Sequence, residues 1–465
     1  MGGNSDNNRL TGLVIKYDRP GPRYTSYPTV PEWSDTYGAQ DYAKAIRIAS
    51  KKVSGPLSLY LHLPFCRKRC WFCGCNTNVT HSLNSIDEYL ARVHKETDLI
   101  VDYLGKRRVV SQFHWGGGSP SILTDAQTER AFNIFRDHFE IQNKAEISIE
   151  LDPRVTTSDR INVLKRLGFN RLSMGVQDFD PEVQKAIGRD QSEKQTVALY
   201  RFCRDRGFTG INFDLIYGLP GQTIAGFTDT IAGVIDLRPD RVAMYSFAFL
   251  PKLKAHQRRI NPEILPDAEA KLMLFSRARR MFLENGYCQI GMDHFVLPDD
   301  ELAVAMREGK LRRNFMGYTV NAAEDWLGVG MSSISYISGN FAQNASGIDS
   351  YNAAIDSGRL ATFRGAILSA DDLIRQRVIT DLMCNFRVDI TAINAAYTIT
   401  FDDYFKSELV QVQPFIDDGL LTRDKRTLRV TEPGQLFVRN IAMIFDAYLA
   451  GRSTDDSKGQ FSRTV

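Results

Sequence analysis

The chain has 465 residues, 43% of them hydrophobic and 24% charged, which is enough for one large domain with a smaller one beside it. Its formal net charge of +3 is too small to indicate a nucleic-acid or membrane partner. Residues 1–10 carry no apolar signal region and no stretch approaches the length of a membrane span, so we expect a cytoplasmic protein whose thiols stay reduced.

Short β-rich runs alternate with helical patterns in the first half of the chain. The predicted strands cover residues 57–63, 109–115, 146–151, 171–176, 210–218 and 241–247. The predicted helices between them cover residues 86–105, 125–139, 157–167, 181–207 and 222–237. This alternation predicts an α/β fold with a parallel sheet, arranged as a partial (β/α)6 TIM-like barrel. We expect weaker later strands, near 289–292 and 326–337, to extend it.

Four cysteines lie within ten positions of the run PFCRKRCWFCGC, residues 64–75. In a reducing compartment this clustering indicates metal binding or catalysis rather than disulfides. A structural zinc site generally uses two well-separated ligand pairs, and this run supplies no second pair. We therefore expect Cys66, Cys70 and Cys73 to hold a four-iron cluster with one iron open to another ligand. A zinc loop or a group of reactive thiols is the alternative.

Polar residues and glycines gather where the predicted strands end. Glu150, Gln177 and Asp214 lie at or near the carboxyl ends of three strands, and residues 116–118, all glycine, follow another. The cysteine run follows the first strand at the same end. Barrel enzymes assemble their active sites at these ends, so the set predicts one active-site mouth. Any single member could instead simply cap its strand.

The C-terminal region predicts a separate, mostly α-helical domain. Helical patterns cover residues 369–384, 402–416 and 433–449, and residues 420–432 suggest a hairpin that turns at Asp424 and Lys425. Helices with such a hairpin suggest a winged-helix-like shape. Acidic residues offset its basic ones, so we expect this domain to cover or pack on the barrel rather than bind DNA. The last helix carries an apolar stripe expected to be core: Phe437, Ile441, Ile444, Phe445 and Tyr448.

The spacing of Cys66, Cys70 and Cys73, with Phe72 before the last, resembles the signature of the radical S-adenosylmethionine superfamily. Longer segments are similar to the oxygen-independent coproporphyrinogen III oxidase family: GPRYTSYPT (21–29), YLHLPFCRKRCWFCGCN (60–76), HWGGGSP (114–120), RLSMGVQDF (171–179), DLIYGLP (214–220), GMDHF (291–295), RNFMGYT (313–319) and CNFR (384–387). The resemblance implies oxidative decarboxylation of the ring A and B propionates of coproporphyrinogen III to vinyl groups. The implied product is protoporphyrinogen IX, in haem biosynthesis.

The resemblance also implies the cofactors and their contacts. These are a 4Fe-4S cluster on the cysteine triad and two S-adenosylmethionine molecules per turnover, in two sites. The implied contacts of the first are Tyr60, Gly117, Glu150 and Ile334, and those of the second are Phe72, Gly118, Ser119, Gln177, Arg189, Asp214 and Ala248. Ser119 departs from the threonine that the family often has, but it keeps the hydroxyl. Cys75 matches an additional cysteine of the family that is not expected to bind the cluster.

The predicted catalytic residues are Tyr60, His62, Cys75 and Glu150. His62 shares a strand face with Tyr60, so it could orient substrate or move a proton, and a satisfied core histidine is the alternative. Cations for the propionates are expected at Arg23, Arg312 or Arg313, whereas Arg67, Lys68 and Arg69 are expected to form a solvated loop face.

The expected domains are an N-terminal extension that closes over the active site (1–54), a radical S-adenosylmethionine catalytic domain (55–368) and a C-terminal helical domain (369–465). We expect a monomer that takes coproporphyrinogen III and a flavodoxin-type electron donor, with no nucleic-acid or membrane partner.

The alternative function is that of a haem chaperone of the related radical S-adenosylmethionine family. Such chaperones share the cysteine triad and the barrel, but they typically have an aromatic residue in place of Cys75 and lack the GPRYTSYPT segment. Both features therefore favour the oxidase. A radical enzyme acting on RNA or protein would need a basic accessory domain, which the sequence does not indicate.

Overall fold

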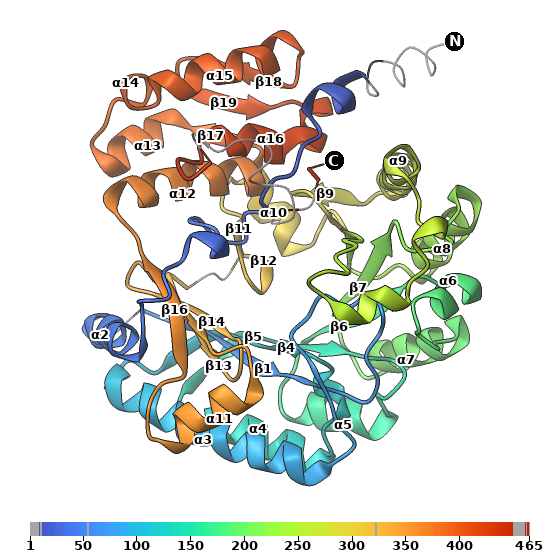
Figure 1. The fold of residues 1–465 in the computed structure, drawn as a ribbon, viewed down its shortest axis with the longest axis vertical. Helices are drawn as coiled ribbons and strands as arrows, with labels where there is room; N and C mark the ends of the chain where they lie inside the picture. The colour runs from blue at the N-terminus through green and yellow to red at the C-terminus, as the bar shows by residue number, and fades with distance from the viewer. Residues whose placement is uncertain are drawn as a thin grey trace.

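The computed structural model describes residues 9, 12–53, 55–320, 323–449, 461, 463 and 464. Its centre is a sheet of twelve strands, in the order β16-β15-β14-β13-β1-β4-β5-β6-β7-β8-β10-β9. Six consecutive strands are parallel and match the six predicted ones: β1 (Leu57–Leu63), β4 (Val109–Gly117), β5 (Glu140–Leu151), β6 (Arg171–Gln177), β7 (Gly210–Tyr217) and β8 (Arg241–Ser246). Among the described strands, β16 and β9 stand at opposite ends of this order, so the barrel is partial, as expected (Figure 1).

Later strands extend the sheet at both edges. β13 (Asp325–Val329) runs parallel to β1, and antiparallel strands follow: β14 (Ile334–Ile337), β15 (Asn340–Asn344) and β16 (Thr362–Ile367). At the other edge, β10 (His294–Val296) pairs antiparallel with both β8 and β9 (Cys288–Ile290). The two expected extensions of the sheet are therefore confirmed.

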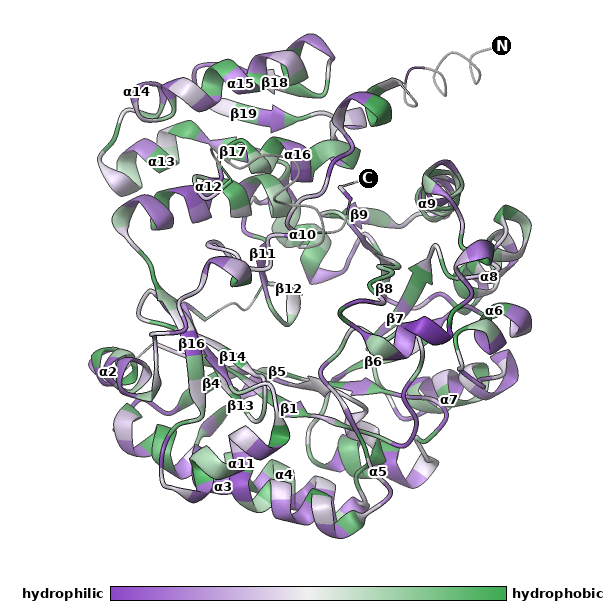
Figure 2. Cartoon of the chain, viewed as in Figure 1, coloured by the Kyte–Doolittle hydropathy of each residue, from purple (hydrophilic) through white to green (hydrophobic). Residues whose placement is uncertain are grey.

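Helices cover the outer side of the parallel strands (Figure 1): α3 (Leu83–Leu104), α4 (Asp125–Arg136), α5 (Ser158–Arg166), α6 (Pro181–Ala186), α7 (Glu193–Asp205), α8 (Ile224–Leu237) and α9 (Ala268–Glu284). Figure 2 shows hydrophilic and hydrophobic residues interspersed along α3 and α4, as expected for helices with one face on a core. Side-chain oxygens of Ser82, Thr124 and Thr157 accept backbone N–H groups where α3, α4 and α5 begin. Within the described chain, no helix is both long and apolar enough to cross a bilayer.

The single helix predicted over residues 181–207 is wrong, because the structure divides it into α6 and α7. Gly188 follows α6 with a φ of +66°, and a Cβ there would lie 2.7 Å from the Trp71 ring. The Ser192 hydroxyl then accepts the Gln195 backbone N–H to begin α7. The break carries Arg189 into the interior, where 6% of the residue is exposed.

The C-terminal region contains α12 (Ala370–Asn385), α13 (Ile390–Tyr397), α14 (Phe401–Tyr404), α15 (Lys406–Asp417) and α16 (Val438–Met443). Its small antiparallel sheet has the order β17 (Arg387–Asp389), β19 (Thr427–Val430), β18 (Leu421–Arg423). The predicted hairpin is thus confirmed, with the Asp424 carboxylate accepting the backbone N–H groups of Arg426 and Thr427 at 2.7 and 2.8 Å. Of the predicted core stripe, Phe437, Ile441 and Phe445 are buried, whereas Ile444 is only partly buried and Tyr448 is exposed, so the prediction is wrong for the last residue.

Two predicted C-terminal helices are shorter than expected. Residues 402–416 are interrupted at Phe405, between α14 and α15. Residues 433–449 form a 3-10 turn, η5 (Pro433–Phe437), and then only α16. Beyond α16 the Asp446 carboxylate accepts the Tyr24 hydroxyl and the Tyr448 backbone N–H, both at 2.9 Å. Contact with the N-terminal segment therefore takes the place of the last helical turns.

The N-terminal segment joins the two halves of the molecule. Figure 1 shows it (blue) passing along the C-terminal helices (red) before it reaches α2 (Ala39–Ala49) at the edge of the sheet. Tyr24 and Tyr27 belong to the C-terminal hydrophobic core, while Trp33 stacks on Phe341 of β15 with ring centroids 4.9 Å apart.

Shorter elements occur in the connecting loops: η1 (Val30–Glu32), β2 (Phe65–Cys66), β3 (Asn78–Val79), η2 (Pro120–Ile122), η3 (Ala255–Arg259), η4 (Pro262–Ile264), α10 (Glu301–Arg307), β11 (Arg312–Asn314), β12 (Gly317–Thr319) and α11 (Ile348–Asp356). The pairs β2–β3 and β11–β12 form two small separate sheets.

Candidate active site

The cysteine run lies beside a cavity of about 680 Å³ at the carboxyl ends of the parallel strands, and Cys66, Cys70, Cys73 and Cys75 all line it. Cys66 ends β2, and its backbone carbonyl accepts the Thr80 N–H at 3.0 Å. The rest of the run is held by the Trp71 N–H, which donates to the Ile187 carbonyl at 2.9 Å. The three cysteines predicted as ligands thus line one open cavity, of a size that suits a cofactor.

Cationic side chains lie beside one thiol of the run, while burial and hydrogen bonding shift the pKa values of two others in opposite directions. Arg154 and Arg189 each place a guanidinium nitrogen near the Cys70 sulfur, at 3.4 and 3.5 Å. A hydrogen bond from Cys75 lowers the pKa of Cys73 to about 6, whereas burial raises the pKa of the Cys66 thiol to about 11. Cations beside a thiolate stabilise its negative charge, so Arg154 and Arg189 would support Cys70 as a thiolate ligand.

The two guanidinium groups are themselves anchored by one carboxylate. Asp152 follows β5 and pairs with Arg154 at 2.6 Å and with Arg189 at 3.5 Å. Burial alone would raise the pKa of Asp152, but the hydrogen bonds of Arg154 and the charge of Arg189 lower it. Arg189 also donates to the Gly175 carbonyl at 2.7 Å, so its position is fixed from β6 as well.

The glycine run forms a close-fitting wall of the cavity. Gly117 has a φ of +115°, and its backbone N–H donates to Glu150 Oε2 at 3.1 Å. A Cβ at Gly116 would lie 2.8 Å from Glu150 Oε1, and one at Gly118 would lie 2.6 Å from the Phe65 carbonyl oxygen. Side chains at these positions would displace the carboxylate or the start of the cysteine run. Glycine is therefore required here by space as well as by conformation.

Asp214 is a partly buried carboxyl group on the inner wall of the barrel. The Ser173 hydroxyl and the Asn212 amide donate to its two oxygens at 2.8 and 2.9 Å. Burial raises the pKa of Asp214 to about 7, against the lowering effect of these hydrogen bonds. This acid is therefore partly protonated near neutral pH and can both accept and donate a hydrogen bond toward the cavity.

All but three of the predicted site residues line this cavity. The exceptions are Tyr60, His62 and Ile334. The Tyr60 hydroxyl lies 2.9 Å from His62 Nδ1, and His62 Nε2 lies 3.0 Å from the Asn76 carbonyl, which holds the end of the cysteine run. Burial lowers the pKa of His62, and its packing against Gly117 supports a positioning role. Residues lining the cavity as predicted are Cys66, Cys70, Phe72, Cys73, Cys75, Gly117, Gly118, Ser119, Glu150, Gln177, Arg189, Asp214 and Ala248.

Several contributors to the site were missed by the sequence predictions. Besides Arg154 and Asp152, two residues of η3 hold the cysteine run: His256 Nε2 lies 2.7 Å from the Cys73 carbonyl, and Gln257 donates to the Phe72 carbonyl at 3.1 Å. Asp152 and Arg154 could have been predicted from the sequence, because the segment DPR (152–154) directly follows the strand that carries Glu150. The segment around η3 carries no comparable signal, since it follows no predicted strand end directly.

The three arginines expected to bind propionates each contact protein groups in the structure. Arg23 pairs with Asp293, Arg313 donates to the Arg23 carbonyl at 2.8 Å, and Arg312 lies 3.3 Å from Asp381. As far as the described residues show, the cavity wall includes none of these arginines. It does include Lys254 and also Lys68 and Arg69, which were expected on a solvated loop face. In the part of the chain that the structure describes, neither lysine has a carboxylate within ion-pair distance.

The donor set fits an iron–sulfur cluster better than a structural zinc ion. Cys66, Cys70 and Cys73 line the cavity, but among the described residues no three cysteine, histidine or carboxylate ligand atoms there lie within 4.8 Å of one another, as the ligands of a single zinc ion would. Among the described residues, the one group of histidine and carboxylate side chains with metal-ligand spacing lies elsewhere, on α3 and after α4.

Comparisons with known proteins agree with this geometry. The family profile "Radical SAM superfamily" matches residues 60–232, and the profile "HemN C-terminal domain" matches residues 368–437. The chain is a radical S-adenosylmethionine protein, because it matches the first profile and carries a cysteine triad at the mouth of a partial barrel. This class implies a 4Fe-4S cluster and S-adenosylmethionine.

Full-length similarity narrows the class. The chain is 44% identical over 453 residues to the oxygen-independent coproporphyrinogen III oxidase of Escherichia coli K12, covering 97% of this chain and 98% of that protein. Identity to the oxidase of Synechocystis is 42%, covering 97% of both chains. The solved structure of the E. coli enzyme, described as a radical SAM enzyme, superposes with a TM-score of 0.90 over 94% of this chain and 98% of that chain. The chain therefore belongs to the oxygen-independent coproporphyrinogen III oxidase family.

Proposed function

We propose that this chain converts coproporphyrinogen III to protoporphyrinogen IX without oxygen, by oxidative decarboxylation of the ring A and B propionates to vinyl groups. The observation that carries this proposal is the cysteine triad, flanked by Arg154 and Arg189, in a chain 44% identical to such an oxidase over 97% of its length. The haem chaperone is the second candidate, and Cys75 at the cavity favours the oxidase over it.

In this proposal Cys66, Cys70 and Cys73 hold the 4Fe-4S cluster. The chemistry that such a cluster supplies when bound is the one-electron reductive cleavage of S-adenosylmethionine. Tyr60, Gly117, Glu150 and Ile334 form the site of one S-adenosylmethionine. A second site, which would allow two molecules per turnover, consists of Phe72, Gly118, Ser119, Gln177, Arg189, Asp214 and Ala248, and all seven line the cavity.

The residues around the cavity have distinct tasks in this scheme. Glu150 accepts a ligand amine or hydroxyl while the Gly117 N–H orients it, and Asp214 binds a ribose hydroxyl. His62 holds Tyr60 and the Asn76 carbonyl in place. Residues 1–54 and 369–465 act as the N-terminal cover and the C-terminal domain around a catalytic domain of residues 55–368, and together they exclude water from the mouth.

Lys68 and Lys254 are the cations we assign to substrate carboxylates. Both line the cavity at the cysteine run without a carboxylate partner among the described residues, so they are available to a propionate. The arginines lining the cavity are less available: Arg154 and Arg189 engage Asp152, Arg171 and Arg241 engage Glu301, and Arg69 donates to the Thr77 carbonyl.

An anaerobic turnover assay tests the proposal. The protein, with its cluster reconstituted, is incubated with S-adenosylmethionine, a flavodoxin-type reductant and coproporphyrinogen III. We expect protoporphyrinogen IX together with 5′-deoxyadenosine in a ratio of two per product. Cys70→Ser should abolish both products, whereas Cys288→Ser, a cysteine outside the cavity, should leave them unchanged. Stable haem binding without turnover would instead establish the chaperone function.

A further inference from the structure

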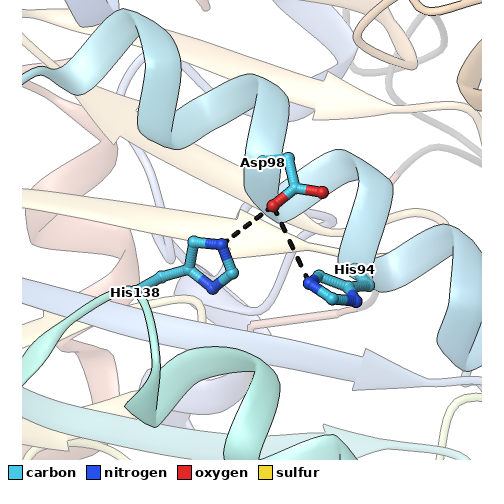
Figure 3. Close-up of side chains that lie close together, drawn as sticks. All are labelled: His94, Asp98 and His138. Carbon is cyan, nitrogen blue, oxygen red and sulfur yellow. Dashed lines mark hydrogen bonds and ion pairs between the residues drawn. The ribbon is translucent and has the colours of Figure 1, made fainter.

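A second group of metal-ligating side chains lies on the outer helical layer. His94 and Asp98 stand four residues apart on α3, so they share one face of the helix, and His138 follows α4 directly beside them. Figure 3 shows both imidazole rings turned toward the Asp98 carboxylate. This group, which we call the α3–α4 cluster, is separate from the cavity, because none of the three residues lines it.

The spacing of the α3–α4 cluster suits a single small cation. His138 Nε2 lies 2.8 Å and His94 Nε2 lies 3.8 Å from Asp98 Oδ1, and the ligand atoms of the group lie within 4.8 Å of one another. Ligands about 2.0–2.1 Å from a tetrahedral zinc ion are about 3.3 Å apart. Small side-chain rotations would therefore bring all three onto one ion, and such rotations are open to His94 and Asp98, which are about half exposed.

The hydrogen bonds of His138 give an independent reason for a cation at this point. Its Nδ1 lies 2.6 Å from the Ile134 carbonyl, so Nδ1 must carry the hydrogen that is donated there. In a neutral imidazole Nε2 then has only a lone pair, and this lone pair faces a carboxylate oxygen at 2.8 Å. The two lone pairs repel each other unless a metal ion lies between them or a second proton makes the ring cationic. A histidine that donates one ring N–H to a backbone carbonyl is also the common arrangement of histidine ligands in metal sites.

Basic side chains of α3 that could compete with a metal ion for Asp98 pair with another carboxylate. Arg92 and Lys95 of α3 both pair with Asp356, at 2.8 and 3.3 Å. Among the residues that the structure describes, Asp98 has only histidines as ion-pair partners. Its carboxylate is therefore not neutralised by a lysine or an arginine.

We propose that His94, Asp98 and His138 form a binding site for a divalent transition-metal ion of the zinc class. Two imidazoles and one carboxylate provide the nitrogen and oxygen ligands that such ions prefer, and the solvent-exposed side supplies water to the remaining position. The ion links the middle of α3 to the end of α4, and it serves as a tether of the outer helical layer. The site does not depend on the chemistry at the cysteine run.

Zinc binding by the full-length protein tests this site. The cluster is first reconstituted under anaerobic conditions so that the cysteine triad is occupied, and Zn²⁺ is then titrated in competition with a chromophoric chelator. We expect one zinc equivalent whose affinity falls at least about tenfold in His94→Gln and in His138→Gln. His81→Gln, an exposed histidine in the loop before α3, is the matched control and should titrate like the wild type.

Zinc K-edge absorption of the one-equivalent complex identifies the ligands independently of stability. We expect a first shell of nitrogen and oxygen only. Sulfur in that shell would place the zinc on the cysteine run and overturn the proposal. Equal zinc affinity in the wild type, His94→Gln and His138→Gln would overturn it as well, and so would a wild type that takes up no zinc, since His138 and Asp98 would then form an ion pair only. His94 is 53% exposed in its side chain, so its variant should fold even if His138→Gln does not.

Discussion

Gly118→Ala should dislodge the start of the cysteine run. The added Cβ would lie 2.6 Å from the Phe65 carbonyl oxygen, 2.8 Å from the Pro64 carbonyl carbon and 2.9 Å from the Phe65 carbonyl carbon. These are backbone atoms next to Cys66, and they are held by hydrogen bonds from the Gly118 N–H to the Leu63 carbonyl and from the Ser119 N–H to the Phe65 carbonyl, each 2.8 Å. Neither the glycine run nor the loop can yield by rotating a side chain.

The magnitude follows from that rigidity. Inserting an extra methyl group into a closely packed region typically lowers the free energy of unfolding by about 1–3 kcal/mol. Here the backbones of the glycine run and of the cysteine run, which hydrogen-bond to each other, must both move. We expect a loss of unfolding free energy in this range and reduced iron retention after anaerobic reconstitution, because Cys66 leaves its position relative to Cys70 and Cys73. Chemical denaturation and iron analysis measure the two effects.

Gly74→Ala is the matched control for this prediction. Gly74 lies in the same cysteine run, but its Cβ would meet no heavy atom within 4 Å. We expect this variant to remain within about 0.5 kcal/mol of the wild type and to retain its iron. If Gly118→Ala kept both the stability and the iron content of Gly74→Ala, the close approach would not constrain the loop and the reasoning would be refuted.

Three further predictions concern buried charge and substrate binding. Burial raises the pKa of Asp214 from 3.8 to about 7, so between these pH values the folded chain keeps a proton that the unfolded chain releases. The free energy of unfolding should therefore fall as pH rises through this window, by at most about 4 kcal/mol, and Asp214→Asn should flatten the fall. Parallel curves of unfolding free energy against pH for the two proteins would contradict this. Arg107 and Asp325 form an ion pair whose side chains are only 1% and 3% exposed. Arg107→Met should lower the free energy of unfolding by about 3–5 kcal/mol, and the double variant Arg107→Met/Asp325→Leu should recover part of this loss. A single variant as stable as the wild type would disprove the reasoning. Lys254→Ala should raise the KM for coproporphyrinogen III, whereas Lys252→Ala, two residues away and outside the cavity wall, should not; equal KM values in steady-state assays would remove Lys254 from the substrate site.

Local patterns were sufficient for the parallel sheet and for the end of it at which the site lies. Six strands were predictable because their apolar residues repeat with the period of a strand, and their polar ends meet because parallel strands share one edge. The division between α6 and α7 was not predicted, since the helical pattern continues across residues 187–192. What ends the helix there is a left-handed Gly188 packed against Trp71, which is a contact with a distant loop.

By itself, the sequence determined the type of chemistry, because the spacing of three cysteines and the glycines that follow β4 are properties of short contiguous segments. Only the tertiary structure decided which charges surround those thiols. Arg154 and Arg189 reach Cys70 across 84 and 119 positions of the chain, and His256 reaches the Cys73 carbonyl across 183. Such contacts depend on strand register and on helix packing, and no local pattern encodes them. The same holds for His94 and His138, which approach each other only because α3 and α4 are neighbours on the outside of the barrel.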